Sequence, residues 1–169
     1  ANLITSKMLS TENPILGLLQ GILGNLGEIL ECPNYVLKYK EKTGLSTERI
    51  QQWGHVAGSA GLDHQKFLDE MATYGPMRGL QGDSLDHAML KIADKLQGMS
   101  ENEAIGYARS HYGFSDETTK FMREQGQGDL AASLSQVPND SILTEEQLNN
   151  LSNLPQRINE LMPKIMLGL

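Results

Sequence analysis

Four histidines are the side chains best suited to hold a metal ion or to act as a general base: His55, His64, His87 and His111. Two histidines that bind zinc from one helix stand four residues apart, as in the His-Glu-x-x-His motif. No two of these four have that spacing. The histidines therefore do not predict a metal site by their pattern.

A second group of polar residues gathers near His87 and has the residue types of a cation site: Asp83, Asp86, His87 and Asp94. Acidic side chains at the beginning of a helix are already favoured by the positive end of the helix dipole. That role explains the group without a bound cation. We therefore expect no metal and no other cofactor.

The common catalytic motifs do not occur in the sequence. It has neither the Gly-x-x-x-x-Gly-Lys phosphate loop nor the Gly-x-Ser-x-Gly nucleophile turn. The single cysteine, Cys32, stands beside Pro33 without a basic neighbour to activate its thiol. Two carboxylates that cleave a glycosidic bond are defined by a distance in space, so the sequence leaves that chemistry open. We nominate no catalytic residue, and apart from this open case we expect no enzyme.

Sharp corners between helices position these residues. One pattern occurs twice, because Gly44 and Gly61 each end a helix while Ser46 and Asp63 begin the next. Glycine suits the left-handed position after a helix, and the Ser or Asp oxygen accepts hydrogen bonds from the first turn. The corner recurs at Gly113-Phe114-Ser115, and capping boxes stand at Ser100-Glu101-Asn102-Glu103 and Thr144-Glu145-Glu146-Gln147.

Composition also favours helices. Only 5% of the residues are aromatic, so Leu, Ile, Met and Ala must fill the core, and these residues suit helix packing. We predict an all-α fold: a compact bundle of short helices with tight glycine-capped corners, plus N- and C-terminal helical arms. The expected core residues are Trp53, Phe67, Leu68, Leu85, Met89, Ile92, Leu96, Ile105, Phe121 and Met122.

Helix-breaking residues set the expected boundaries. We expect Cys32-Pro33 to end the first helix, Gly75-Pro76 to end the helix that follows Asp63, and Gly126 with Gly128 to end the helix of Phe121. The predicted organisation is an N-terminal apolar helical arm (1–32), an all-α core domain (33–130), a linker (131–143) and a C-terminal helical arm (144–169).

An apolar seam in the N-terminal arm predicts self-association. Its residues alternate spacings of four and three, which is the pattern of a coiled coil. A lone helix with this seam exposed would carry a larger apolar patch than soluble monomers tolerate, unless the arm folds back on its own domain. Polar residues interrupt the run and no charged region precedes it, so we expect neither membrane contact nor a signal peptide. The predicted oligomer contacts are Ile15, Leu19, Ile22, Leu26 and Ile29.

The net charge of −7 argues against binding to a phosphate backbone. The short helices imitate a helix-turn-helix DNA reader, whose recognition helix would span residues 64–74. That helix carries Asp69 and Glu70 and only Lys66 as a cation. We therefore expect no direct sequence-specific contact with nucleic acid, although a helical regulatory or nucleic-acid-binding module remains an alternative.

Two blocks of residues, which together cover about residues 35–128, carry a recognisable pattern. The first reads Tyr39-x-x-x-Thr43-Gly44-Leu45-Ser46-x-Glu48-x-Ile50-Gln51-Gln52-Trp53-x-x-Val56-Ala57, then Ala60-Gly61-Leu62-Asp63. The second reads Leu90-x-Ile92-Ala93-Asp94-x-Leu96-x-x-Met99, followed by Ala108 and Tyr112-Gly113-Phe114-Ser115. In order and spacing the two blocks resemble a segment of phage and prophage tail tape measure proteins.

The resemblance implies a structural protein of the virion tail, assembled in the cytoplasm of the bacterial host and acting in tail assembly, tail length or DNA ejection. It further implies other tail proteins as partners, namely tube, chaperone and baseplate proteins, besides copies of the chain itself. The chain would be a segment or a short relative of a tape measure protein. The alternative is a muramidase-like domain that cleaves the cell wall and is carried on a tail protein.

Overall fold

The structure of the protein, a computed structural model, describes residues 26–152 and the side chains of residues 35–151. This part of the chain is all-α, as predicted, with seven α-helices, one short 3₁₀ helix and no strand. The elements are α3 (Leu26–Thr43), α4 (Thr47–Ser59), α5 (His64–Met77), α6 (Asp83–Gln97), α7 (Glu101–His111), α8 (Asp116–Ser135), η2 (Asn139–Ser141) and α9 (Glu145–Ser152).

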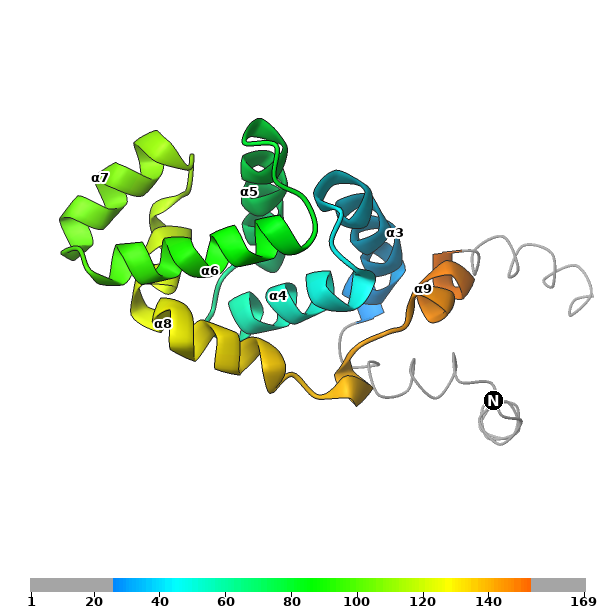
Figure 1. Cartoon of the computed structure of the whole chain (residues 1–169). Coiled ribbons are helices and arrows are strands. Elements are labelled where there is room, and N and C mark those ends of the chain that lie inside the picture. The colour runs from blue at the N-terminus through cyan, green and yellow to red at the C-terminus, as the bar shows by residue number, and fades with distance from the viewer. Residues whose placement is uncertain (1–25, 153–169) are drawn as a thin grey trace, which may run out of the picture. The chain divides into compact units, whose positions relative to one another are not determined.

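The chain divides into two compact units. The larger unit comprises residues 38–143, and the described residues of the other are 26–37 and 144–152. Within the larger unit α8 packs along α6 and also contacts α4 and α7, while α4 packs against α5 (Figure 1). Helix α8 is thus the common support of this unit.

The predicted corners are confirmed. Gly44, Gly61 and Gly113 all have positive φ angles, between 69° and 88°. After the first two glycines, Ser46 accepts a hydrogen bond from the Arg49 N–H, and Asp63 accepts from the first turn of α5. Ser100 and Ser115 cap α7 and α8 in the same way, and Thr144 forms its predicted reciprocal capping box with Gln147.

The predicted core is confirmed at every position except one. Ile105 is only half-buried, and its neighbours Ala104 and Ala108 are fully buried instead. Helix α7 packs against α8, and two alanines one turn apart let the helix backbones approach more closely than an isoleucine would. The buried large side chains include Trp53, Phe67, Leu68, Leu85, Met89, Leu96 and Met122.

Two expected helix ends were wrong because proline did not stop the helix. Helix α3 runs through Cys32-Pro33, and α5 runs through Gly75-Pro76 to Met77. A proline removes one backbone donor, which a helix survives when its neighbouring turns persist. Gly75 serves a different purpose, because a Cβ at that position would lie 2.9 Å from a Leu85 methyl group. Close packing between α5 and α6, rather than a chain reversal, requires the glycine.

The break predicted for the helix of Phe121 is confirmed at Gly126, whose backbone is not helical, and a second helical segment follows it within α8. Gly126 has φ 67° and ψ 175°, so it kinks α8, but the helix resumes and ends at Ser135. The second part of α8 buries Leu130 and Leu134 completely. Apolar residues at this spacing lie on one face of a helix, and their burial compensates for the kink.

Residues 131–143, expected as a linker, belong to the larger unit. The side-chain amide of Gln51 donates to the Leu143 carbonyl at 2.7 Å and accepts from the Leu143 N–H at 2.8 Å. Val137, Ile142 and Leu143 are buried. The Ser, Pro, Asn and Asp residues that suggested a linker thus form a packed connection, so the unit extends past the predicted boundary at residue 130.

Two glycines of α8 give a matched test of the kink. We expect Gly126→Ala to lower the free energy of unfolding by at least roughly 1–2 kcal/mol, because a Cβ is strained at positive φ. It would also meet the Gln97 side chain at 2.4 Å. Gly128→Ala should raise it by roughly 0.5–1 kcal/mol, since alanine suits a helix and a Cβ there meets nothing within 4 Å. Urea denaturation measures both, and equal stability of the two variants would contradict the kink.

Candidate functional site

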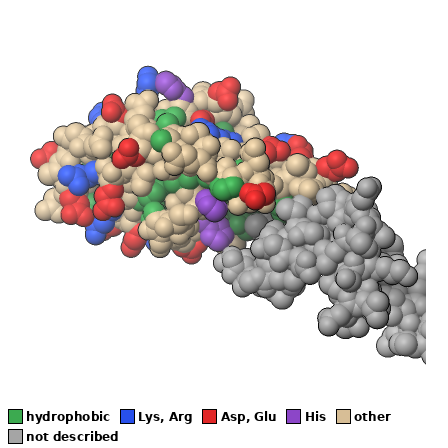
Figure 2. All heavy atoms as spheres, turned by 90° about the horizontal axis from the view of Figure 1, so that it is seen from below, with side chains coloured by type: hydrophobic (Ala, Val, Ile, Leu, Met, Phe, Trp, Pro, Cys, Tyr) green, Lys and Arg blue, Asp and Glu red, His purple; other side chains and the backbone are tan. Residues whose placement is uncertain are grey.

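The four histidines lie on four different helices: His55 on α4, His64 on α5, His87 on α6 and His111 on α7. All are exposed except His64, which is half-buried. Figure 2 shows histidine side chains on one face of the molecule, where acidic and basic side chains are intermixed. Within residues 35–151 no three His, Cys, Asp or Glu side chains gather closely enough to hold a metal ion. The histidines do not form a common site.

The acidic group near His87 is separated by the fold. Asp86 accepts two hydrogen bonds from the Arg49 guanidinium, both 2.8 Å, and a third from the Trp53 indole N–H, also 2.8 Å. Asp83, His87 and Asp94 are exposed. Asp86 therefore ties α6 to α4, and a carboxylate with three donors in this geometry is a structural partner rather than a free base.

Two further carboxylates on α5 are also used between helices. Glu70 accepts hydrogen bonds from the Ser115 N–H and from the Ser115 and Thr118 hydroxyls at the beginning of α8. Asp69 accepts from the buried Tyr39 hydroxyl of α3. Burial and the neighbouring Asp69 raise the pKa of Tyr39 above its ordinary value. Both acids of the helix that imitated a DNA reader thus bond to other helices.

A cavity of about 540 Å³ opens between the beginning of α5 and α8, and its lining includes Asp63, Lys66, Glu117 and Glu124. It is the place where a carboxylate pair for glycoside cleavage would be sought. Asp63 is engaged as the cap of α5. Bonding to its own backbone and the nearby Lys66 ammonium lower the pKa of Glu117. A general acid needs a raised pKa, so Glu117 has the opposite property.

A second hollow of about 260 Å³ lies nearby, where α4 ends and α8 passes into the connection before η2. His55, Ser59, Gln125 and Gln136 contribute polar groups to its lining. Within this lining no hydroxyl is hydrogen-bonded to the His55 imidazole, which is the contact that activates a serine nucleophile.

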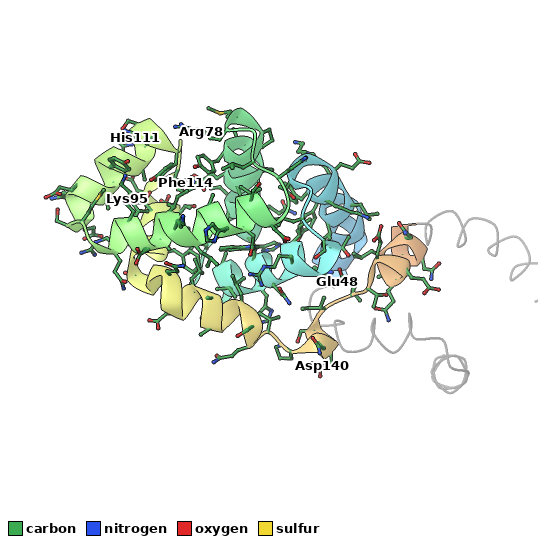
Figure 3. All side chains as sticks on the ribbon, in the orientation of Figure 1. Glu48, Arg78, Lys95, His111, Phe114 and Asp140 are labelled. Carbon is green, nitrogen blue, oxygen red and sulfur yellow. The ribbon has the colours of Figure 1, made fainter. Side chains whose placement is uncertain are left out.

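Five aromatic side chains gather at one end of the larger unit, apart from the stack of Trp53, Phe67 and Phe121. Tyr107 and His111, one turn apart on α7, stack with ring centroids 3.9 Å apart and planes 14° apart. Tyr112 packs edge-on against Tyr107 at 5.7 Å and against Tyr74 at 5.5 Å. Phe114 completes the group at 5.4 Å from Tyr112. We call Tyr74, Tyr107, His111, Tyr112 and Phe114 the aromatic cluster (Figure 3).

Two cations lie against this cluster. The Lys95 ammonium is 4.7 Å from the Tyr107 ring centroid, and the Arg78 guanidinium is 6.0 Å from that of Tyr74. Hydrogen bonding to Lys95 lowers the pKa of Tyr107, whereas burial and a hydrogen bond with Tyr107 raise the pKa of Tyr112. Apart from His111, these residues could not be identified from the sequence, because they come from α5, α6, α7 and the corner after α7 and share no motif.

The predicted oligomer contacts are not tested by the structure. Ile15, Leu19 and Ile22 lie outside the described residues, and so do the side chains of Leu26 and Ile29. The Cys32 side chain lies outside them as well. Among the helices of residues 26–152, none is long and apolar enough to cross a membrane.

Comparison with protein-family models, with curated proteins and with solved structures finds no match to this chain.

Two aspartates in the first turn of α6 give a matched test of the Asp86 contacts. We expect Asp86→Ala to lower the free energy of unfolding by roughly 2–3 kcal/mol, because it leaves a guanidinium and an indole N–H without their acceptor. Asp83→Ala should lower the free energy of unfolding by no more than roughly 0.3–1 kcal/mol, which is the typical stabilisation by one acidic side chain near the beginning of a helix. Chemical denaturation of both variants checks the difference, and equal losses would show that Asp86 acts only through the dipole.

The raised pKa of Tyr39 predicts a loss of stability in alkali. The folded state holds the phenol proton more tightly than the unfolded state, so the contribution is complete below the ordinary pKa of about 10 and is lost as the pH rises through the folded value. Tyr39→Phe should lose less stability than the natural chain as the pH rises above roughly 10. Thermal unfolding across that range measures it. Parallel losses in both proteins would exclude Tyr39 as a cause.

Proposed function

We propose that the chain is a non-enzymatic structural protein of a phage or prophage tail, built like a segment of a tape measure protein. The observation that carries the proposal is the use of its polar side chains. Asp86, Glu70, Asp69 and Gln51 all bond to neighbouring elements of the larger unit. Such a chain is a folded module that offers surfaces rather than reacting groups.

The residues that carry the resemblance have structural roles in this fold. Tyr39, Leu45, Ile50 and Trp53 of the first block are buried, and so are Ile92, Ala93, Leu96, Ala108 and Phe114 of the second. Ser46, Asp63 and Ser115 cap helices. A motif made of core positions and helix caps specifies a fold. The resemblance is therefore one of fold, which supports a structural role like that of a tape measure segment.

The cell-wall-cleaving alternative has weaker support. Its best location is the cavity beside α8, where Asp63 already accepts two backbone hydrogen bonds and the Glu117 pKa is lowered. A glycosidase requires one carboxyl that stays protonated beside one that is ionised. Glu124 is the remaining acid of this lining, and a single carboxylate does not make such a pair.

The nucleic-acid-binding alternative is weaker for a physical reason. The chain carries a net charge of −7, and the helix that imitates a recognition helix buries Phe67, Leu68 and Met71 on one side. Its acids Asp69 and Glu70 bond to other helices. Neither charge nor geometry therefore favours insertion of this helix into a groove of DNA.

The proposal places the protein in the virion tail, after assembly in the bacterial cytoplasm. Its partners there are tube, chaperone and baseplate proteins and copies of itself, with contacts through Ile15, Leu19, Ile22, Leu26 and Ile29.

Tail particles provide the direct test. We expect the chain to co-purify with tails from an induced host culture in a constant ratio to the tube protein, as measured by quantitative mass spectrometry. Labelling with a gold-tagged antibody should mark tails rather than heads or free protein. Absence of the chain from intact tails, with normal recovery of tube protein, would reject the proposal.

An activity assay addresses the alternative. Incubation of the purified chain with peptidoglycan should release no soluble fragments. Release that disappears in Glu124→Gln but persists in Glu103→Gln, an exposed acid of α7, would instead establish cleavage and overturn the structural assignment.

A further inference from the structure

Arg78 and Lys95 differ from the ion-paired cations of the described residues. Arg49, Lys66, Arg109 and Lys120 each pair with a carboxylate, at distances from 2.7 to 3.8 Å. Within residues 35–151, Arg78 and Lys95 have no such partner and lie over tyrosine rings instead. Both are exposed. Their positive charge is thus directed at the aromatic cluster and at solvent.

Both cations influence the Tyr107 hydroxyl. Both favour negative charge on the Tyr107 oxygen, Lys95 mainly by a hydrogen bond and Arg78 by its charge, and the pKa of Tyr107 is accordingly lowered. A group that stabilises a phenolate also stabilises an external anion beside it. Figure 3 shows Arg78, Lys95 and His111 together at this end, whereas Glu48 and Asp140 lie at the opposite end of the larger unit.

The site is held in shape before any ligand arrives. One Arg78 nitrogen donates to the His111 carbonyl at 2.8 Å, which fixes the guanidinium and leaves most of its five N–H groups free. Tyr107 is stacked on His111 and covered by Lys95. Binding to a preorganised surface loses little side-chain entropy, which favours affinity.

We propose that Arg78, Lys95 and Tyr107 form a docking surface for a carboxylate side chain of an acidic protein segment. Arginine binds a carboxylate through two parallel hydrogen bonds, and Lys95 adds a second charge. Met77, immediately before Arg78, is 74% exposed and is the one large hydrophobic side chain that is exposed within the described residues. Arg, Tyr and Met are enriched at protein interfaces, so an apolar side chain beside the carboxylate completes the partner.

A protein carboxylate fits better than a nucleic acid. The chain has a net charge of −7, which repels a polyphosphate along its whole length but repels a segment with few carboxylates much less. The surface also consists of two cations, Arg78 and Lys95, whereas single-stranded nucleic acid follows an extended basic groove. This inference does not depend on the tail assignment, because it follows from the contacts and charges of these side chains.

Binding of a short peptide of glutamate and leucine tests the surface. We expect this peptide to bind the intact chain more tightly than its glutamine counterpart, and Arg78→Gln or Lys95→Gln to weaken binding by about tenfold, the value of one charged hydrogen bond. Lys91→Gln removes an equal charge from an exposed site on the same helix as Lys95 and should leave binding unchanged. Binding should also raise the pKa of Tyr107, as followed by phenolate absorbance. Circular dichroism confirms that each variant is folded.

Three results would overturn the inference. Equal affinity for the glutamate and glutamine peptides would show that no carboxylate is recognised. A loss in Lys91→Gln as large as that in Lys95→Gln would show that net charge alone governs binding. Tighter binding of a short oligothymidylate than of the acidic peptide, lost in Arg78→Gln, would assign the surface to nucleic acid.

Discussion

A single carboxylate fixes the arrangement on which the larger unit depends. Asp86 stands in the first turn of α6 and receives three hydrogen bonds from α4, two from Arg49 and one from Trp53. The indole is fully buried, so its N–H would be costly to leave without an acceptor. Once Asp86 holds α4 against α6, the apolar faces of both helices close on α8. Packing supplies the stability, and this contact selects the orientation.

Other polar side chains also join two elements by hydrogen bonds, in these cases at helix ends. Glu70 reaches the exposed N–H group at the start of α8, and the Gln51 amide pairs with both backbone groups of Leu143. Each contact satisfies groups that a short helix or an irregular connection leaves open. A bundle of short helices has many helix ends, which explains why many of its polar side chains bond to backbone groups of neighbouring elements.

The cations beside the aromatic cluster do not follow this pattern of contacts between helices. Arg78 and Lys95 face tyrosine rings and solvent, whereas Arg49, Lys66, Arg109 and Lys120 are paired with acids. That surface differs from the cavity beside α8, where Asp63 caps α5 and Lys66 pairs with Glu117.

The sequence by itself determined what depends on neighbours within one turn. The all-α class and the caps at Ser46, Asp63 and Ser100 are of this kind, because a capping oxygen and its N–H partners stand two or three residues apart. Tertiary structure decided the rest. Trp53 meets Asp86 across 33 positions and Ser115 meets Glu70 across 45, and no periodicity encodes such pairs. It also decided that Gly75 would serve close packing instead of a turn, since Leu85 arrives from another helix. The cations at the aromatic cluster were beyond prediction for the same reason: their site exists only after three helices have packed together.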